Sequence, residues 1–179
     1  QMVETVLYIA TSLDGYIARP DGNLDWLSSF PAPETGDYGY TELLNSIEAI
    51  IMGRKTYEAI IGFGVDWPYT GIDAYVVTTN KELQIKSPDT FLLTNDTNDF
   101  VTKLRRKTKR DIWLVGGGQL ITKFINEAIL DKMIITVIPK MIGKGIPLFA
   151  DKLKETNLRI VDIQLFDTGA VNLTYEMAK

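Results

Sequence analysis

Three consecutive glycines at a strand–helix junction constrain this chain more than any other feature. Ile112–Val115 is a short apolar run typical of a buried strand, Gly116, Gly117 and Gly118 follow directly, and apolar residues then recur at helical spacing up to Asn126. Glycine lets the backbone approach a ligand closely because it has no Cβ, and free N–H groups at a helix N-terminus favour phosphate. A tight turn that only packs the helix onto a sheet is the alternative, but three glycines exceed what a turn needs.

Composition excludes several classes of chemistry. The 179 residues contain no cysteine and no histidine, which removes disulfides, thiol nucleophiles, histidine bases and the usual zinc sites, so we expect no metal. Acid–base chemistry must use Asp, Glu, Tyr, Lys or water. A net charge of −4 argues against nucleic acid, and no apolar run approaches membrane-spanning length. We expect one domain over residues 2–179, with no signal peptide and a cytoplasmic location.

Strands alternate with helices along most of the chain. Residues 11–35 are expected to form a long structured loop anchored by Trp26, Leu27 and Phe30, and such loops are often functional lids. Asp37 could cap a helix that runs to about residue 46. The expected strands span residues 3–10, 48–52, 74–78, 91–94, 112–115, 132–138, 158–166 and 171–177, and the last two form a hairpin. This order predicts a three-layer α/β fold, with a mostly parallel sheet and antiparallel strands at its edge.

A second strand–glycine–helix junction follows residues 48–52. Gly53 ends that strand, and Arg54, Lys55 and Thr56 stand in the first turn of the next helix, where cations oppose the helix dipole unless an anion is bound. Two hydroxyls, Thr78 and Thr79, follow the next strand. Because ligands of open α/β sheets bind at the carboxyl ends of strands, one extended ligand with several phosphates could reach all three places, and a dinucleotide fits. The triple glycine itself does not match GxGxxG, since Ile121 stands where the third glycine should be.

A basic segment, Lys103–Arg110, carries six cations at the end of the helix expected after Asn95. It could be a phosphate or nucleic-acid patch. Cations at a helix C-terminus also complement the helix dipole, and the rest of the chain is acidic, so we interpret the segment as a solvated helix end.

Four segments resemble the dihydrofolate reductase superfamily. Ile51–Glu58 and Leu114–Gly118 look like its two NADPH-binding motifs. Ser12–Ala18 and Ile138–Phe149 look more like one branch, the C-terminal reductase domain of bifunctional riboflavin-biosynthesis deaminase–reductases and its stand-alone relatives. The resemblance covers nearly the whole chain, and it implies a dihydrofolate reductase-like sheet of eight strands with flanking helices, often paired into a homodimer.

The resemblance also implies a set of NADPH-binding residues. Phosphates would be held around Gly53, Arg54, Lys55 and Thr56, and the adenosine 2′-phosphate would lie near Thr78 and Thr79. The pyrophosphate would be covered by Gly116, Gly117, Gly118, Gln119 and Leu120, and the nicotinamide would be bordered by Ala10 and Ile17. The family usually has a cis peptide between the first two glycines of this motif, so the Gly116–Gly117 bond is the candidate.

Candidates for the catalytic groups are Asp37, Asp14 and Thr136. Asp37 lies at the spacing of the acid that binds the pteridine in dihydrofolate reductases, but it could equally be a helix cap. Asp14 matches the riboflavin branch, but Asp-Gly is also an ordinary turn. Thr136 falls on the strand that faces the substrate in the family. Bound water is the other possible proton donor.

The sequence departs from the riboflavin-branch pattern in two ways. Ile121 replaces the aromatic residue often found after the glycines. The chain also lacks the H-x-E and P-C-x-x-C signatures of the deaminase partner, so it cannot be the bifunctional enzyme. We therefore expect an NADPH-dependent reductase of a small heterocyclic substrate, similar to the 5-amino-6-(5-phosphoribosylamino)uracil reductase domain. A dihydrofolate or pterin reductase and a non-catalytic NADPH-binding protein are the alternatives, and NADH is not excluded.

Overall fold

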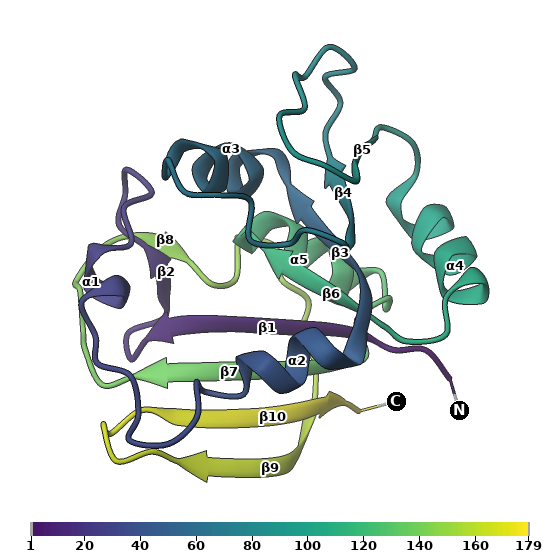
Figure 1. Ribbon diagram of the computed structural model, residues 1–179. Helices are drawn as coiled ribbons and strands as arrows, with labels where there is room; N and C mark the ends of the chain where they lie inside the picture. Colours follow the sequence, from purple (N-terminus) through teal and green to yellow (C-terminus); the bar gives the residue numbers. More distant parts are fainter. Residues whose placement is uncertain (1, 179) are drawn as a thin grey trace.

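A mixed sheet forms the centre of the molecule (Figure 1). The computed structural model describes residues 2–178. Within them the sheet has eight strands, in the order β5-β4-β3-β6-β1-β7-β10-β9. These strands are β1 (Thr5–Ser12), β3 (Ile47–Gly53), β4 (Asp73–Val77), β5 (Thr90–Leu93), β6 (Asp111–Gly116), β7 (Lys132–Ile138), β9 (Leu158–Leu165) and β10 (Val171–Met177). The strands from β5 to β7 pair in parallel, whereas β10 pairs antiparallel with both β7 and β9. The predicted mixed sheet with an antiparallel C-terminal hairpin is confirmed.

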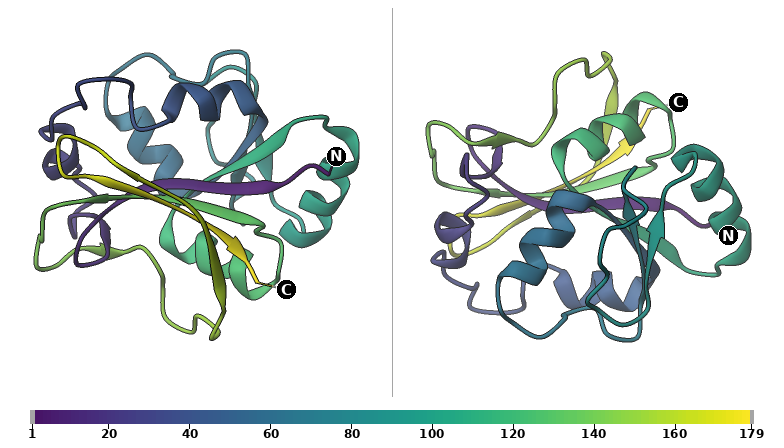
Figure 2. Two further views of the ribbon diagram at one scale, coloured as in Figure 1. Left: turned by 90° about the horizontal axis from the view of Figure 1, so that it is seen from below. Right: turned by 90° about the horizontal axis from the view of Figure 1, so that it is seen from above.

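Helices cover both faces of the parallel strands. On one face α2 (Tyr40–Ser46) and α3 (Arg54–Gly62) pack against a cluster that includes Ile50, Met52 and Val76. On the other face α4 (Thr97–Lys107) and α5 (Gly118–Asn126) cover a cluster that includes Leu7 and Leu114. Figure 2 shows this three-layer arrangement from below and from above. Because β-strand side chains alternate between faces, successive residues of β3 enter the two cores in turn.

The segment between β1 and α2 has more regular structure than the sequence predicted. It contains β2 (Tyr16–Ala18) and the short α1 (Asp25–Ser28), and β2 pairs antiparallel with the two-residue β8 (Ile146–Pro147). Apolar alternation cannot reveal such short elements. The predicted anchors are confirmed, because Trp26 is 1% exposed and packs against Ile138, with Leu27 and Phe30 beside it.

The strand boundaries lie within two residues of those predicted, and α2 begins two residues later than a cap at Asp37 implies. It begins at Tyr40 after Gly39, and Gly39 has a left-handed φ of 87°. Asp37 nevertheless acts on this turn, since its carboxylate accepts hydrogen bonds from the Thr41 backbone N–H (3.3 Å) and hydroxyl (2.6 Å). Among the described residues, no helix is long and apolar enough to cross a membrane.

Candidate nucleotide cleft

Three strand ends that the sequence singled out lie side by side. Gly53 at the end of β3 pairs with Val77 at the end of β4, and Met52 pairs with Gly116 on the opposite side of β3. Thr78 follows Val77 directly. The carboxyl edge of the β4-β3-β6 group therefore brings together a hydroxyl, a helix start and the triple glycine, as the topology of open α/β sheets requires.

Two helices begin at this edge with glycine caps. Gly53 precedes α3 and Gly117 precedes α5, and within residues 2–178 no side chain caps either helix and neither has an acid in its first turn. By contrast α4, which follows β5 at the same edge of the sheet, is capped by the Asp96 carboxylate. The N–H groups at the start of a helix need an acceptor, and the dipole favours an anion there. Two uncapped starts side by side fit a phosphate-bearing ligand.

The three glycines have three different roles. A Cβ on Gly118 would lie 2.4 Å from the Pro147 carbonyl oxygen, so this glycine allows β8 to pack against α5. Gly116 has a φ of 136°, which other residues rarely adopt. A Cβ on Gly117, however, would meet only Thr56 Oγ1 at 3.5 Å and Ile17 Cδ1 at 3.8 Å. Packing therefore explains Gly118 and backbone conformation explains Gly116, whereas neither explains Gly117, which lies next to Thr56 and Ile17.

Residues from both ends of the predicted cofactor site meet at Gly117. Thr56, on α3, is one of the residues predicted to hold phosphates, and Ile17, on β2, is predicted to border the nicotinamide. The Gly116–Gly117 peptide is cis, as the resemblance implied. Ala10 lies near this region on β1 and packs against the cluster that contains Trp26.

The side chains of the other predicted cofactor residues are paired within the protein, exposed or buried. Arg54 forms an ion pair with Glu58 one turn along α3, while Lys55 and Gln119 are exposed. Thr78 accepts a hydrogen bond from the Asn80 N–H (3.0 Å), and Thr79 is exposed. The side chain of Leu120 is 8% exposed and belongs to the core below α5, so only its backbone can face a ligand.

Thr136 lies in a buried polar network that sequence reasoning missed. Its hydroxyl donates to Asn172 Oδ1 (2.6 Å), and Asn172 Nδ2 donates to the Tyr38 carbonyl oxygen (2.8 Å), which also accepts from the Tyr8 hydroxyl (2.8 Å). Thr136 is 2% exposed and Asn172 is 6% exposed. The network thus ties β1, β7 and β10 to the turn before α2. The available signal was the polar Asn172 on the alternating strand 171–177, to which the sequence analysis assigned no role.

The two candidate carboxylates are both ionised and both bonded to the protein. The pKa of Asp37 is lowered, mainly because the Thr41 hydroxyl donates to it. The pKa of Asp14 is lowered mainly by the Ser12 hydroxyl, with help from the N–H groups of Ile142 and Gly143. Asp14 therefore joins the segment between β1 and α2 to the loop after β7. Neither group holds a proton near neutral pH, so water is the better proton donor.

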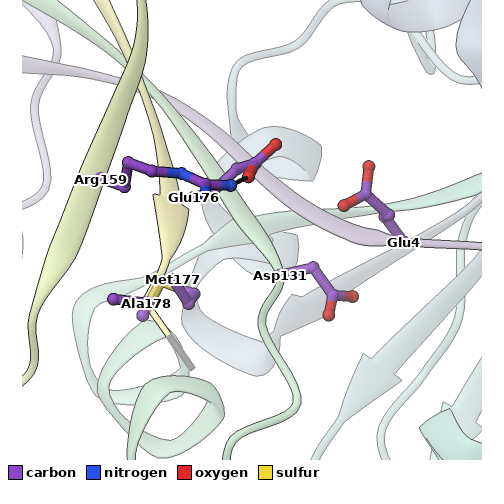
Figure 3. A pocket seen from close by; sticks show the side chains of 6 residues that line it. All are labelled: Glu4, Asp131, Arg159, Glu176, Met177 and Ala178. Carbon is purple, nitrogen blue, oxygen red and sulfur yellow. Dashed lines mark hydrogen bonds and ion pairs between the residues drawn. The ribbon is translucent and has the colours of Figure 1, made fainter.

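A separate pocket of about 410 Å³ opens at the opposite edge of the sheet (Figure 3). Its lining includes Glu4, Asp131 and Glu176, with Arg159 paired to Glu176. Burial and the neighbouring carboxylates raise the pKa of Glu4, although Lys132 opposes this shift. Crowded carboxylates repel a nucleotide, so this pocket does not compete with the Gly117 cleft.

Three of the six cations of the basic segment contact other groups of the same chain. Arg105 donates to the Val3 carbonyl oxygen and pairs with Asp131 (3.0 Å), and Lys103 pairs with Asp99 (3.0 Å). Arg110 donates to the Asn45 carbonyl oxygen (3.2 Å). These contacts support its interpretation as a helix end.

The fold and the cleft define a class: a dihydrofolate reductase-like α/β protein with a glycine cradle at the carboxyl edge of its sheet. A family model described as the RibD C-terminal domain matches residues 5–172, and the chain belongs to that family. Structural neighbours that share the fold include Acinetobacter baumannii RibD, at 18% identity and a TM-score of 0.75, with this chain covering 59% of that one.

Individual relatives agree with this assignment. The chain is 38% identical to the uncharacterized Bacillus subtilis protein YwjB, over 98% of each chain. The crystal structure of a Shewanella sp. PV-4 protein described as a riboflavin biosynthesis protein superposes with a TM-score of 0.88 at 30% identity, covering 99% of this chain and 100% of that one. Enterococcus faecalis dihydrofolate reductase in complex with NADP(H) has the same fold, with a TM-score of 0.70 at 16% identity, covering 98% of this chain and 97% of that one.

Proposed function

We propose that this protein is an NADPH-dependent reductase similar to the reductase domain of riboflavin biosynthesis. The observation that carries the proposal is the meeting of two uncapped helix starts at Gly117, with Thr56 and Ile17 next to that glycine. A pyrophosphate needs both close backbone approach and free N–H donors. The fold shared with a dihydrofolate reductase that binds NADP(H) supports the same cofactor.

Each part of the cleft would have a distinct task. The N–H groups at the starts of α3 and α5 and the Thr56 hydroxyl would hold phosphates, Arg54 and Lys55 would supply positive charge, and Thr78 would lie towards the adenosine end. Ala10 and Ile17 would position the nicotinamide. NADPH, when bound, supplies a hydride to a C=N or C=O carbon. The protein would orient the substrate, and the lid of residues 11–35 would exclude water.

The proton is proposed to come from water. Asp37 is ionised, so its role would be to bind a donor group of the substrate or to orient that water. A dihydrofolate or pterin reductase is the second candidate, favoured by the position of Asp37 just before α2. An assay that measures NADPH oxidation with either the riboflavin pyrimidine intermediate or dihydrofolate as substrate separates these candidates. NADPH binding without turnover of either would favour a non-catalytic protein.

Calorimetric titration with NADPH and then NADH tests the cofactor site. We expect a dissociation constant in the micromolar range for NADPH, roughly −8 kcal/mol. Gly117→Ala places a methyl group in the cleft at ordinary contact distance from Thr56 and Ile17, so this variant should fold but lose at least about tenfold in affinity. Gly62→Ala is the matched control, because a Cβ at Gly62 meets nothing within 4 Å. Equal NADPH affinity of Gly117→Ala and Gly62→Ala would contradict a cofactor site at Gly117.

We also propose that the protein forms a homodimer through β9 and β10. Every residue of β9 is exposed, and Ile163 and Leu165 are 63% and 74% exposed. Ile163 pairs with Leu173, which pairs in turn with Ile135 below α5, so these side chains continue the apolar face of the sheet beyond its helical cover. In Figure 1, β9 forms the open edge of the sheet.

A second copy is the occupant that this surface fits. Ile163 and Leu165 stand at the same place on both copies, so a twofold axis beside β9 can bring the apolar strip of one copy against that of the other. Self-complementarity of this kind is what a twofold interface requires. Sedimentation velocity should show a dimer at micromolar concentration and a monomer for Ile163→Lys. A dimeric Ile163→Lys variant would contradict this interface.

A further inference from the structure

The segments that follow β1 and β7 are joined into one small unit. β2 pairs antiparallel with β8, and the two strands lie side by side in Figure 1. Two backbone hydrogen bonds extend this pairing, from the Leu13 N–H to the Lys140 carbonyl oxygen (2.8 Å) and from the Leu148 N–H to the Gly15 carbonyl oxygen (2.9 Å). The segments 13–18 and 140–148 together are called the β2–β8 unit below.

The β2–β8 unit lies directly against the triple glycine. A Cβ on Gly118 would come within 2.4 Å of the Pro147 carbonyl oxygen, so β8 rests on the first turn of α5. Ile17, in the middle of β2, lies next to Gly117. Whatever holds β2 on β8 therefore also holds Ile17 at the place where it would border the nicotinamide.

β8 is anchored on α5 by a further contact. The Ala150 N–H, just after β8, donates to the Thr122 hydroxyl (2.8 Å), and this hydroxyl donates to the Gly118 carbonyl oxygen (2.8 Å). Thr122 is 4% exposed, so water does not compete for these bonds. β8 is thus a fixed support, and the position of Ile17 depends on how firmly β2 is held on it.

The strand pairing alone holds β2 weakly. β2 has three residues and β8 has two, and an isolated two-stranded pair is marginally stable in water. The register also shifts between Tyr16 and Ala18, on either side of Ile17. A contact outside the strand pairing therefore has a large share in keeping Ile17 in one place.

Asp14 supplies such a contact. Its carboxylate accepts the Gly143 N–H (2.8 Å) and the Ile142 N–H (3.2 Å) from the loop after β7, and the Ser12 hydroxyl (2.5 Å) from its own segment. The Ser12 hydroxyl in turn accepts the Tyr16 N–H (3.0 Å), at the start of β2. Hydrogen bonds to an ionised group are stronger than those between neutral groups. One carboxylate thus ties the start of β2 to the loop that leads into β8.

We infer that Asp14 is a positioning residue for the cofactor, which holds Ile17 beside Gly117 by joining the two segments of the β2–β8 unit and contacts no reacting atom itself. The inference rests on the proposed function, because Ile17 borders a nicotinamide only if NADPH binds at Gly117. It gives Asp14 a role other than the catalytic one considered from the sequence. It also predicts an effect that is confined to the nicotinamide half of the cofactor.

Amide hydrogen exchange tests the joint without any cofactor. In Asp14→Ala the Gly143 N–H loses its acceptor, so it should exchange at least about tenfold faster than in the unmodified protein. Asp14→Asn keeps one carbonyl oxygen as an acceptor and should give an intermediate rate. Equal exchange of the Gly143 N–H in Asp14→Ala and in the unmodified protein would overturn the inference.

Asp111→Ala is the matched control. The Asp111 carboxylate also accepts a backbone N–H from a distant segment, that of Glu4 (2.9 Å), but it stands at the first residue of β6, at the opposite end of that strand from Gly116. This variant loses a contact of the same kind away from the glycines. It should leave both the exchange of the Gly143 N–H and the binding of NADPH unchanged.

Calorimetry locates the effect on the cofactor. NADPH is compared with adenosine 2′,5′-bisphosphate, which carries the adenosine half and lacks the nicotinamide. Asp14→Ala should weaken NADPH about tenfold and change the affinity for the bisphosphate by less than about twofold, whereas Asp111→Ala should change neither. A general loss of stability would weaken both ligands alike. Equal losses for the two ligands, or no loss for NADPH, would therefore overturn the inference.

The fluorescence of bound NADPH reports on the nicotinamide directly. At saturating NADPH, emission from Asp14→Ala should be closer to that of free NADPH, and emission from Asp111→Ala should match the unmodified protein. Equal emission from all three would overturn the role of Asp14. An unmodified protein that does not bind NADPH contradicts the proposed function itself. An unmodified protein that binds NADPH, with the same affinity in Asp14→Ala, contradicts only the role of Asp14.

Discussion

The buried pair Thr136 and Asn172 provides the sharpest test of whether Thr136 acts in chemistry or in structure. Asn172→Ala removes the acceptor of the Thr136 hydroxyl and one of two donors to the Tyr38 carbonyl oxygen. The Tyr38 oxygen keeps its bond from Tyr8. The Thr136 hydroxyl, which is 2% exposed, is left without its acceptor.

The magnitude follows from the two lost bonds. A buried polar group left unsatisfied costs about 1–3 kcal/mol, and the lost bond to Tyr38 adds about 1 kcal/mol. Asn172→Ala should therefore reduce the free energy of unfolding by about 2–4 kcal/mol, and a chain of this length would lose roughly 5–15 °C in melting temperature. Urea unfolding followed by circular dichroism measures the change.

A double-mutant cycle isolates the pair. Thr136→Val combined with Asn172→Leu removes both polar partners, so no Thr136 hydroxyl is left unsatisfied, and the double variant should be about 1–2 kcal/mol more stable than the sum of the single changes. If the effects are additive, the two groups do not form a unit. If Thr136→Val abolishes turnover while the melting temperature stays within about 1 °C, Thr136 contacts the substrate and the structural argument is refuted.

The remaining predictions concern the glycines, the acid and the cofactor charge. Gly118→Ala should destabilise the protein by about 2–4 kcal/mol, because the new Cβ would clash with the Pro147 carbonyl oxygen. Gly62→Ala should be neutral or stabilising by up to about 1 kcal/mol, because a Cβ there meets nothing within 4 Å. Thermal melts compare the two variants, and equal melting temperatures would contradict the packing role of Gly118. Asp37 has a lowered pKa, so it stays ionised between about pH 5 and 8. The kcat–pH profiles of the unmodified protein and of Asp37→Asn should therefore have the same shape in this range. An ionisation that is present in the unmodified protein and lost in the variant would identify Asp37 as the proton donor. The lowered pKa also means that any stability from Asp37 is present above the ordinary pKa of Asp and is lost as the pH falls through the folded-state value, so the two proteins should converge in stability in strong acid. If Arg54 contacts the 2′-phosphate that distinguishes NADPH from NADH, Arg54→Ala should weaken the binding of NADPH more than that of NADH in calorimetry. Equal losses of affinity would show that Arg54 does not contact this phosphate.

Local patterns predicted most of the fold because they depend on neighbouring residues alone. Alternation located the strand 171–177 at the residues that the structure has, and apolar runs located the buried strands β7 and β6. The sequence analysis did not predict the short elements β2, α1 and β8, because two to four residues are too few to show a period. β2 and β8 pair with each other although they are far apart in the chain.

The candidate site divides in the same way. The sequence by itself determined that glycines and hydroxyls follow successive strands, and the rule that parallel strands end at one edge was enough to place them together. Only the tertiary structure decided which glycine lies next to other predicted cofactor residues, because that depends on Pro147 lying against Gly118 and on Thr56 and Ile17 approaching Gly117 from other elements. It also decided that Thr136 is buried against Asn172, since a hydroxyl on a strand points to solvent, to a substrate or to another strand according to what packs over it.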